Sequence, residues 1–435
     1  MKKFLLSILI ILMCGFLITC VGDQKNDENG KIEKDDEEDE EDDDGGDIIV
    51  DDDYGEIEFN RIYIENKLFM VDGKRIWING ANTPWNKWDE FGSNENWNEY
   101  DNNWWDNEFA RLKNAGINAT RIWISCKNDA KYNPPISINS NGKITGIREK
   151  FWTDLDKLFN LATKHKIYIM ATLISFDHFK QQEPWQKMIK DKDNVHSFAE
   201  HYTLPFVKKY RDNPYLWSID ICNEIEWIFE GDTALYGNPK PTWAQIQYFL
   251  AYNAAVIHSN SNILVTAGFA SVKYNGADSQ RASDSVLKAQ FNNPKAHLDF
   301  WSPHYYEWVG EWYGVPFYLT PSGAISGNNT SGFSGGWRLD GSKPAVIGEC
   351  SAMGTSAKER GWVASGSRPP VSNTIITDFQ YAYNNGWQGV MPWTSNGADV
   401  NGNLNNFKSA TEYMRDTYRE IIFPSIKDDE EPNEP

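Results

Sequence analysis

Two glutamates stand where α/β proteins place reactive side chains. Glu224 ends an apolar run that starts at residue 217, and Glu349 ends another that starts at residue 344. A strand holds its last side chain rigidly while the following loop opens to solvent, so an acid there is well placed for chemistry. Two carboxylates that face one bond can protonate a leaving oxygen and attack a carbon. A single glutamate of this kind is as often a solvated loop residue, so the surrounding elements are needed to decide whether these two glutamates are functional.

From residue 55 onward, apolar runs of strand length alternate with amphipathic runs of helix length. An alternating segment at residues 57–64, a second at 68–71 and a turn at Asp72-Gly73 predict a small β-hairpin. Eight further strands are expected at residues 76–81, 118–124, 167–173, 216–223, 262–268, 298–304, 344–349 and 389–393. Helices are expected at residues 104–115, 152–165, 195–210, 243–258 and 373–385.

Eight strands that are apolar on both faces, with helices between them, are typical of a closed parallel barrel. We therefore expect an α/β fold, a single (β/α)8 TIM barrel with a short N-terminal β-hairpin. The alternative is a doubly wound open sheet, but Asn82-Thr-Pro-Trp85 follows the first strand where a glycine-rich nucleotide turn would stand. On the barrel count, Glu224 ends strand four and Glu349 ends strand seven.

The net charge of −20 is concentrated outside this predicted barrel. Residues 21–53 hold 18 acids and 3 lysines, and residues 428–435 hold five acids, whereas residues 54–427 hold 39 acids and 37 lysines and arginines. We expect an acidic disordered linker at 21–54, a catalytic domain at 55–427 and an acidic tail at 428–435. A calcium site in the linker lacks the spacing of a defined loop. The near-neutral barrel offers no basic face for nucleic acid.

The first twenty residues have the pattern of an export signal, with Lys2 and Lys3 before an apolar run. Leu17-Ile-Thr-Cys20 resembles the lipobox of bacterial lipoproteins, which would make Cys20 a lipidated residue that anchors the protein at the membrane. A transmembrane anchor is the alternative, but the apolar stretch is short for a span. We expect a secreted or extracytoplasmic protein, tethered at the surface if Cys20 is acylated.

Three cysteines remain beyond the signal, namely Cys126, Cys222 and Cys350. A three-cysteine metal site is conceivable, but no Cys-x-x-Cys spacing supports it. We expect buried thiols that pack as small apolar side chains, and no metal.

The placement of the two acids, with Asn223 directly before the first, resembles the barrel glycosidases whose acid/base and nucleophile follow strands four and seven. More narrowly, residues 60–420 resemble glycoside hydrolase family five, although Ile225 stands where the family has proline. The resemblance implies that Glu224 is the acid/base and Glu349 the nucleophile of a retaining mechanism. It also implies that no cofactor is required.

Four further residues match the family. Arg121, in Thr120-Arg-Ile-Trp123, would hold the nucleophile ionised. Asn223 would bind the sugar 2-hydroxyl. In the run Pro303-His-Tyr-Tyr306, the family pattern implies that Tyr306 orients the nucleophile and His304 the acid/base.

Three more residues are candidates for contact with sugar or for support of the site. Trp393, at the end of strand eight, matches the family tryptophan that forms the floor under the cleaved sugar. Trp85 lies in an expected loop over the strand ends, where an aromatic ring can stack on a sugar. His178 follows strand three, roughly where many members contribute a subsite histidine.

The resemblance implies a retaining endo-glycosidase that cuts a β-1,4-linked polysaccharide, and Arg-Ile-Trp123 is closer to the mannanases of the family than to its cellulases. An endo-β-1,4-glucanase is the close alternative. From other classes, a non-catalytic carbohydrate-binding lipoprotein and a structural surface protein remain open. We expect a monomer whose partner is the polysaccharide.

Overall fold

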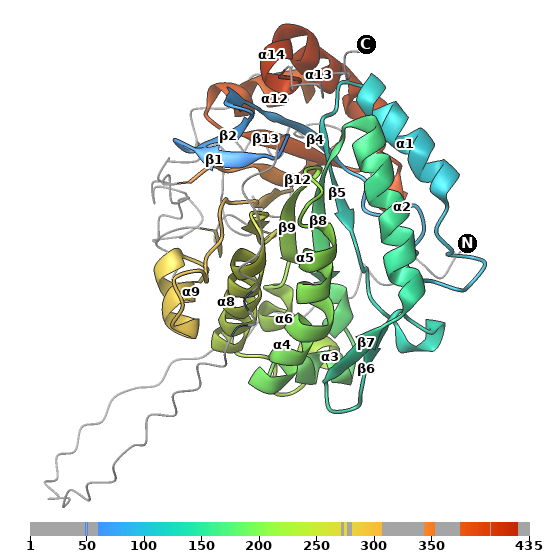
Figure 1. Cartoon of the computed structure of the whole chain (residues 1–435), viewed down its shortest axis with the longest axis vertical. Helices are drawn as coiled ribbons and strands as arrows, with labels where there is room; N and C mark the ends of the chain where they lie inside the picture. Colours follow the sequence, from blue (N-terminus) through green and yellow to red (C-terminus); the bar gives the residue numbers. More distant parts are fainter. Residues whose placement is uncertain are drawn as a thin grey trace, which may run out of the picture. The chain divides into compact units, whose positions relative to one another are not determined.

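Eight mostly buried strands pair in parallel and form the centre of the fold (Figure 1). The computed structural model describes residues 48, 50, 60–270, 274–275, 281–306, 343–352, 375–400 and 402–424. In sheet order the strands are β10 (Leu264–Thr266), β9 (Leu216–Asn223), β8 (Tyr168–Ser175), β5 (Ala119–Trp123), β4 (Ile78–Asn82), β13 (Gly389–Trp393), β12 (Ile347–Ser351) and β11 (His304–Tyr305). Each neighbouring pair in this order is parallel.

Backbone hydrogen bonds also join the two end strands of this sheet. The N–H of Asp299 donates to the carbonyl of Val265 at 2.8 Å, and the N–H of His304 donates to the carbonyl of Phe269 at 2.8 Å. These bonds connect the segment that leads into β11 with β10 and the residues after it, and we call this the β10–β11 seam. The predicted (β/α)8 barrel is therefore confirmed, although β11 is shorter than the strand expected at 298–304.

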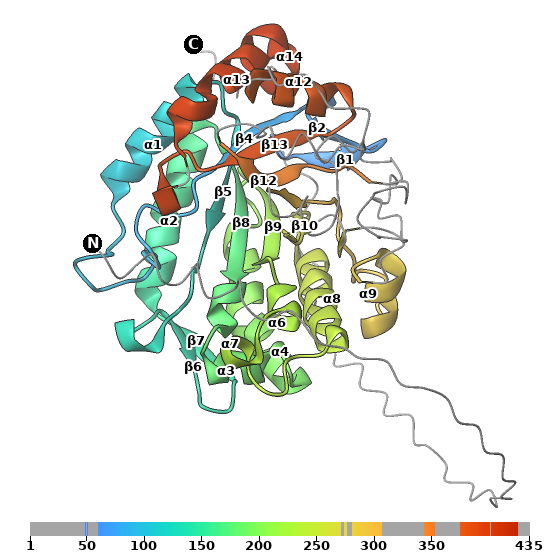
Figure 2. The same ribbon diagram turned by 180° about the vertical axis from the view of Figure 1, so that it is seen from behind.

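Helices surround the strands (Figure 2). Their bounds are α1 (Asn102–Asn114), α2 (Glu149–His165), α3 (Glu183–Met188), α4 (Lys192–Phe198), α5 (Leu204–Tyr210), α6 (Trp227–Glu230), α7 (Thr233–Tyr236), α8 (Trp243–Asn260), α9 (Asp284–Phe291), α12 (Ile375–Asn384), α13 (Leu404–Thr417) and α14 (Arg419–Ile422). The longest of these, α8, starts with a capping box in which the side chains of Thr242 and Gln245 satisfy each other's backbone N–H groups. It is buried along most of its length.

The predicted hairpin forms a small antiparallel sheet of β1 (Tyr63–Glu65), β2 (Leu68–Val71) and β3 (Lys74–Arg75). Its residue Phe69 is fully buried, with ring centroids 5.3 Å from Trp217 and 5.3 Å from Phe300. Trp217 lies near the start of β9, so the hairpin covers the amino ends of the barrel strands. The opposite, carboxyl ends of the strands carry the two glutamates.

Three local features differ from the sequence prediction. The helix expected at 195–210 divides into α4, a π-helical turn at Ala199–Thr203 and α5. Pro205 has no N–H to continue the α-helical pattern, and the N–H of Leu204 bonds to Ala199 instead. A hairpin of β6 (Ile136–Ile138) and β7 (Ile144–Ile147), and the helix α13 after strand eight, were not predicted.

Several predictions fall on residues outside the described ranges. They include the export signal with Cys20, the acidic linker, the acidic tail and the domain boundaries at 54 and 427. Cys126, Cys222 and Cys350 are buried, as predicted, and they form no disulfide among the described residues. In the same ranges, no helix has both the length and the apolar character that a bilayer crossing needs.

Candidate active site

Arg121, on β5, is the centre of a buried network at the carboxyl ends of the strands. Its Nη1 donates to Glu349 Oε1 at 2.6 Å and to Asn82 Oδ1 at 3.1 Å. Its Nη2 donates to Asn223 Oδ1 at 2.7 Å and to Asp220 Oδ2 at 2.7 Å, and its Nε reaches the same Asp220 oxygen at 3.0 Å. The guanidinium is fully buried, so these charge-assisted bonds act in a medium that screens them weakly.

Glu224 directly follows β9 and turns out of the strand. Its φ of +46° lies in the left-handed region, which non-glycine residues seldom adopt and which is frequent at functional sites. Its N–H donates to the carbonyl of Gly268 at 2.7 Å, which fixes the backbone there. The side chain is 13% exposed, and its Oε2 accepts a hydrogen bond from Trp227 Nε1 at 2.9 Å. Burial raises the pKa of Glu224 to about 7.

His304 and Tyr306 connect the two glutamates. His304 Nδ1 lies 2.8 Å from Glu224 Oε1 and 3.6 Å from Glu349 Oε2. The hydroxyl of Tyr306 donates to Glu349 Oε2 at 2.7 Å. Burial lowers the pKa of His304 to about 4, so the imidazole is neutral at ordinary pH. The side chains therefore pair as the sequence resemblance implied, His304 with Glu224 and Tyr306 with Glu349.

The two carboxylates share a site but have different surroundings. One oxygen of each lies within 4.8 Å of the other and of His304. Burial raises the pKa of Glu349 above its ordinary value, and the guanidinium of Arg121 and the hydroxyl of Tyr306 act in the opposite direction. The guanidinium of Arg121 contacts Glu349 and not Glu224, and its positive charge stabilises the ionised form of Glu349. If the pair holds a single proton, that proton therefore lies on Glu224. The site can thus present one neutral acid and one carboxylate.

Four tryptophans gather beside the carboxylates. Trp393 ends β13, Trp123 ends β5, and Trp85 and Trp88 follow β4. The ring centroid of Trp85 lies 4.6 Å from that of Trp88, 5.1 Å from that of Trp123 and 5.9 Å from that of Trp393. Tyr306 packs against this cluster, so the aromatic wall is continuous with the residue that contacts Glu349.

A shallow hollow continues from this wall. It is lined in part by Trp88, Trp97 and Tyr132. Trp97 and Tyr132 are 52% and 42% exposed, and their ring centroids lie 5.3 Å apart. Large exposed rings of this kind offer flat apolar faces to a ligand.

His178 and Glu226 have positions different from those of the other candidates. His178 is fully buried, with Nε2 2.9 Å from Ser125 Oγ and its ring against Trp185. It supports the end of β8 and does not reach a ligand directly. Glu226, two residues after Glu224, is also buried and accepts the N–H of Ala270 at 2.5 Å.

Sequence reasoning missed Asp220 and Asn82. Asp220 is fully buried and accepts hydrogen bonds from Arg121, from Thr172 Oγ1 at 3.0 Å and from the N–H of Gly268 at 2.8 Å. An acid in the middle of the apolar strand β9 was the available signal, because a buried carboxylate needs a cation or several donors. Asn82 ends β4 and carried no comparable signal.

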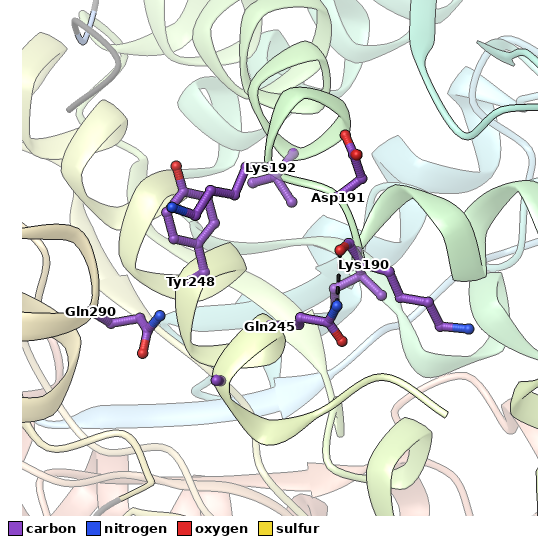
Figure 3. A pocket seen from close by; sticks show the side chains of 9 residues that line it. Lys190, Asp191, Lys192, Gln245, Tyr248 and Gln290 are labelled. Atoms are coloured by element: carbon purple, nitrogen blue, oxygen red, sulfur yellow. Dashed lines mark hydrogen bonds between the residues drawn. The ribbon is translucent and has the colours of Figure 1, made fainter. Parts of the chain in front are cut away.

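A separate pocket of about 240 Å³ lies between the start of α4 and the start of α8 (Figure 3). Lys190, Asp191, Gln245 and Tyr248 are among the residues that line it. The side chain of Asp191 accepts the N–H of Asn194 as the cap of α4. With this single carboxylate, the pocket does not have the pair of acids that the strand ends provide.

Two groups of three histidine or carboxylate side chains could hold a metal within the described ranges, and one of them is Glu224, His304 and Glu349. The guanidinium of Arg121, 2.6 Å from Glu349, already supplies the positive charge there. A second cation would be repelled, so this group does not favour a metal. The other group lies elsewhere and is treated below.

Fold and geometry together define a (β/α)8 barrel with a carboxylate pair at the carboxyl ends of strands four and seven; Glu224 directly follows β9, whereas Glu349 lies within β12, which continues two residues beyond the predicted end. No family model matches the chain. It is 22% identical over 368 residues to a mannan endo-1,4-β-mannosidase of Cryptopygus antarcticus, a match that covers 78% of this chain and 85% of the relative. It is 23% identical over 385 residues to a protein of the same name from Mytilus edulis, which covers 81% and 94%.

Solved structures show the same fold. The β-1,4-D-mannanase of Cryptopygus antarcticus superposes with a TM-score of 0.64 at 19% identity, over 82% of this chain and 94% of that one. The β-mannanase of the blue mussel Mytilus edulis gives 0.63 at 19% identity, over 82% and 96%. The chain is thus similar in sequence to mannan endo-1,4-β-mannosidases and has the fold of solved β-mannanases.

Proposed function

We propose that this chain is a retaining endo-glycoside hydrolase of family five that cleaves β-1,4-mannan. The observation that carries the proposal is the close pair of a neutral acid, Glu224, and a carboxylate bound by a guanidinium, Glu349. Retaining glycosidases place their carboxyl groups about 5–5.5 Å apart, and inverting ones about 6.5–9.5 Å. The approach within 4.8 Å supports retention. The names of the relatives support mannan as the substrate.

In the first step, protonated Glu224 gives its proton to the glycosidic oxygen as a Glu349 oxygen attacks the anomeric carbon. The bond between that carbon and the glycosidic oxygen breaks, and the leaving part of the chain departs with a new hydroxyl. Glu349 now carries the sugar as an ester, and Glu224 is a carboxylate. Arg121 and Tyr306 hold the attacking carboxylate in position before the reaction.

In the second step, Glu224 takes a proton from water as the water oxygen bonds to the anomeric carbon. The ester bond breaks, its electron pair returns to Glu349, and the sugar leaves with its original configuration because the carbon has inverted twice. A pKa near 7 suits a group that must give and then take a proton.

The sugar-binding roles follow from the same contacts. The Oδ1 of Asn223 accepts from Arg121, which directs the amide Nδ2 as donor towards a sugar hydroxyl. Trp393 and Trp85 provide apolar ring surface beneath the substrate. The exposed pair Trp97 and Tyr132 extends this surface along the hollow, which suits an enzyme that binds within a long polymer.

Reducing-sugar release tests the proposal. We would assay the full chain on glucomannan, galactomannan, carboxymethyl cellulose and xylan, and follow viscosity on the mannans. A fast loss of viscosity at low sugar release is expected of endo cleavage. The variant Glu349→Ala should lose activity on every substrate, and azide should restore part of it by acting as an external nucleophile. The variant Glu224→Ala should keep activity only on aryl mannosides whose leaving group needs no proton.

The matched control is Glu226→Gln. Burial raises the pKa of Glu226 well above its ordinary value, and glutamine keeps the shape of this side chain only two residues from the proposed acid. This variant should retain mannan hydrolysis. Hydrolysis of carboxymethyl cellulose alone would replace the mannanase by the endo-glucanase alternative. Binding of mannan without hydrolysis, unchanged in both glutamate variants, would favour the carbohydrate-binding lipoprotein.

We also propose that the protein acts outside the cytoplasm. The support is the export pattern of the first twenty residues. Lipidation at Cys20 and a monomeric state stay predictions, and the mass of the mature N-terminal peptide would test the first of them.

A further inference from the structure

The second group of candidate metal ligands lies far from the glutamates in the fold. His258 is near the end of α8, while His297 and Asp299 belong to the connection between α9 and β11. Helix α8 runs back along the barrel and ends just before β10 begins, so these residues lie at the amino ends of the strands. Helices α8 and α9 pack side by side there (Figure 1). The proposed catalysis uses none of these residues.

The three side chains converge closely. His258 Nε2 lies 2.8 Å from Asp299 Oδ2, and His297 Nε2 lies 3.6 Å from Asp299 Oδ1. The two imidazole rings stack with centroids 4.4 Å apart. All three are partly accessible, so solvent can deliver an ion and supply a further ligand.

The hydrogen bonds of the two histidines determine which ring nitrogen faces Asp299. His258 Nδ1 lies 2.7 Å from the carbonyl of Lys295, and His297 Nδ1 lies 3.2 Å from the carbonyl of Pro294. A carbonyl only accepts, so each Nδ1–H donates to its carbonyl, and the Nε2 atom of each ring is the one that faces Asp299. His258 Nε2 lies at hydrogen-bond distance from Asp299, and a metal ion would take the place of the proton between these two atoms. An Nδ1–H bonded to a carbonyl is also the usual support of a metal-binding histidine.

We propose that His258, His297 and Asp299 bind a divalent transition-metal ion of the zinc type, with water as the fourth ligand. Tetrahedral zinc bonds of about 2.0–2.1 Å put neighbouring ligand atoms about 3.3 Å apart, between the two separations found here. Two imidazoles and one carboxylate suit zinc, whereas calcium and magnesium prefer oxygen ligands throughout.

The ion would act at the β10–β11 seam, where the two end strands of the sheet are joined by hydrogen bonds of neighbouring segments and not by a strand ladder among the described residues. At the β10–β11 seam, Asp299 already bonds twice to Val265, through its N–H and through Oδ2, which accepts the N–H of Val265 at 2.7 Å. A metal bound to Asp299 and His258 ties this seam to the end of α8. We therefore expect the ion to stabilise the fold and to leave the chemistry at the opposite strand ends unchanged.

Calorimetric titration of the full chain, without a histidine tag, by zinc chloride at mildly alkaline pH tests this proposal. The acidic residues 21–53 and the glutamate site can also attract cations, so the comparison is between variants of the same length. The wild type should bind one zinc ion more than the variant His258→Ala/His297→Ala. His297→Gln alone, which removes the more weakly held histidine, should lose affinity at least tenfold. Lys295→Ala keeps the carbonyl, removes a nearby positive charge and should bind zinc more tightly.

Thermal unfolding gives an independent readout. Zinc should raise the unfolding temperature of the wild type more than that of His297→Gln, and both should unfold at similar temperatures in the presence of a chelator. Equal zinc stoichiometry and equal thermal shifts in the wild type and the variants would overturn the proposal and assign the bound zinc to other groups. Because binding and unfolding are measured without substrate, this result does not depend on the proposed hydrolase activity.

Discussion

In the proposed mechanism the pKa of Glu224 sets the upper pH limit of activity; burial raises this pKa, and a hydrogen bond from Trp227 lowers it. Trp227 Nε1 donates to Glu224 Oε2 at 2.9 Å, and this bond favours the carboxylate and so lowers the pKa of Glu224. The proposed mechanism requires protonated Glu224 as the acid, so we expect activity below its pKa of about 7 and a loss of activity as the pH rises through that value. The alkaline limb of kcat/KM is therefore expected near pH 7.

The substitution Trp227→Phe should move this limb upward. A hydrogen bond to a charged group contributes about 1.5–3 kcal/mol, and because Trp227 is only half-buried the lower figure applies. One pH unit corresponds to about 1.4 kcal/mol, so the pKa of Glu224 should rise by about one, to about 8. The assay is kcat/KM on mannan against pH for the wild type and the variant, with Trp152→Phe, on α2, as the control.

A purely substrate-binding role for Trp227 would give a different result. In that case KM would rise and the alkaline limb would stay in place. A limb that stays in place or moves to lower pH would refute the assignment of Glu224 as the group that titrates there.

Two further predictions concern the surroundings of the carboxylates. Tyr306→Phe removes the donor to Glu349 Oε2, so kcat/KM should fall about tenfold to a hundredfold. The acid limb of kcat/KM should also move to higher pH, because loss of that bond raises the pKa of Glu349. An unchanged pH profile would contradict this. Gly268→Ala would put a Cβ 2.9 Å from His304 Nε2 and 3.0 Å from Arg121 Nη2, so denaturant unfolding should show a loss of about 1–3 kcal/mol together with reduced activity. Wild-type stability and activity in this variant would contradict the prediction, because they would show that the network accommodates the additional methyl group.

The sequence determined the repeated elements and the chemical types at the strand ends. The predicted strand that precedes Glu224 matches β9 residue for residue, and the last strand matches β13, because a buried strand shows in the sequence as an unbroken apolar run. The run around Glu349 and the motif that contains His304 and Tyr306 were equally visible. Elements that depend on local geometry, such as the π-helical turn before Pro205, were not.

Only the tertiary structure decided how the two glutamates differ. Arg121 and Glu349 are 228 residues apart in the chain, yet their side chains meet at 2.6 Å. Asp220 completes the network from the interior of a strand, where the sequence shows an acid among apolar residues but does not show which cation it meets. A pKa is set by burial and by charges within a few ångströms, and periodicity fixes which face a residue occupies but not its distance from residues on other strands. The sequence could therefore name both acids, while the folded barrel determines which of them holds the proton.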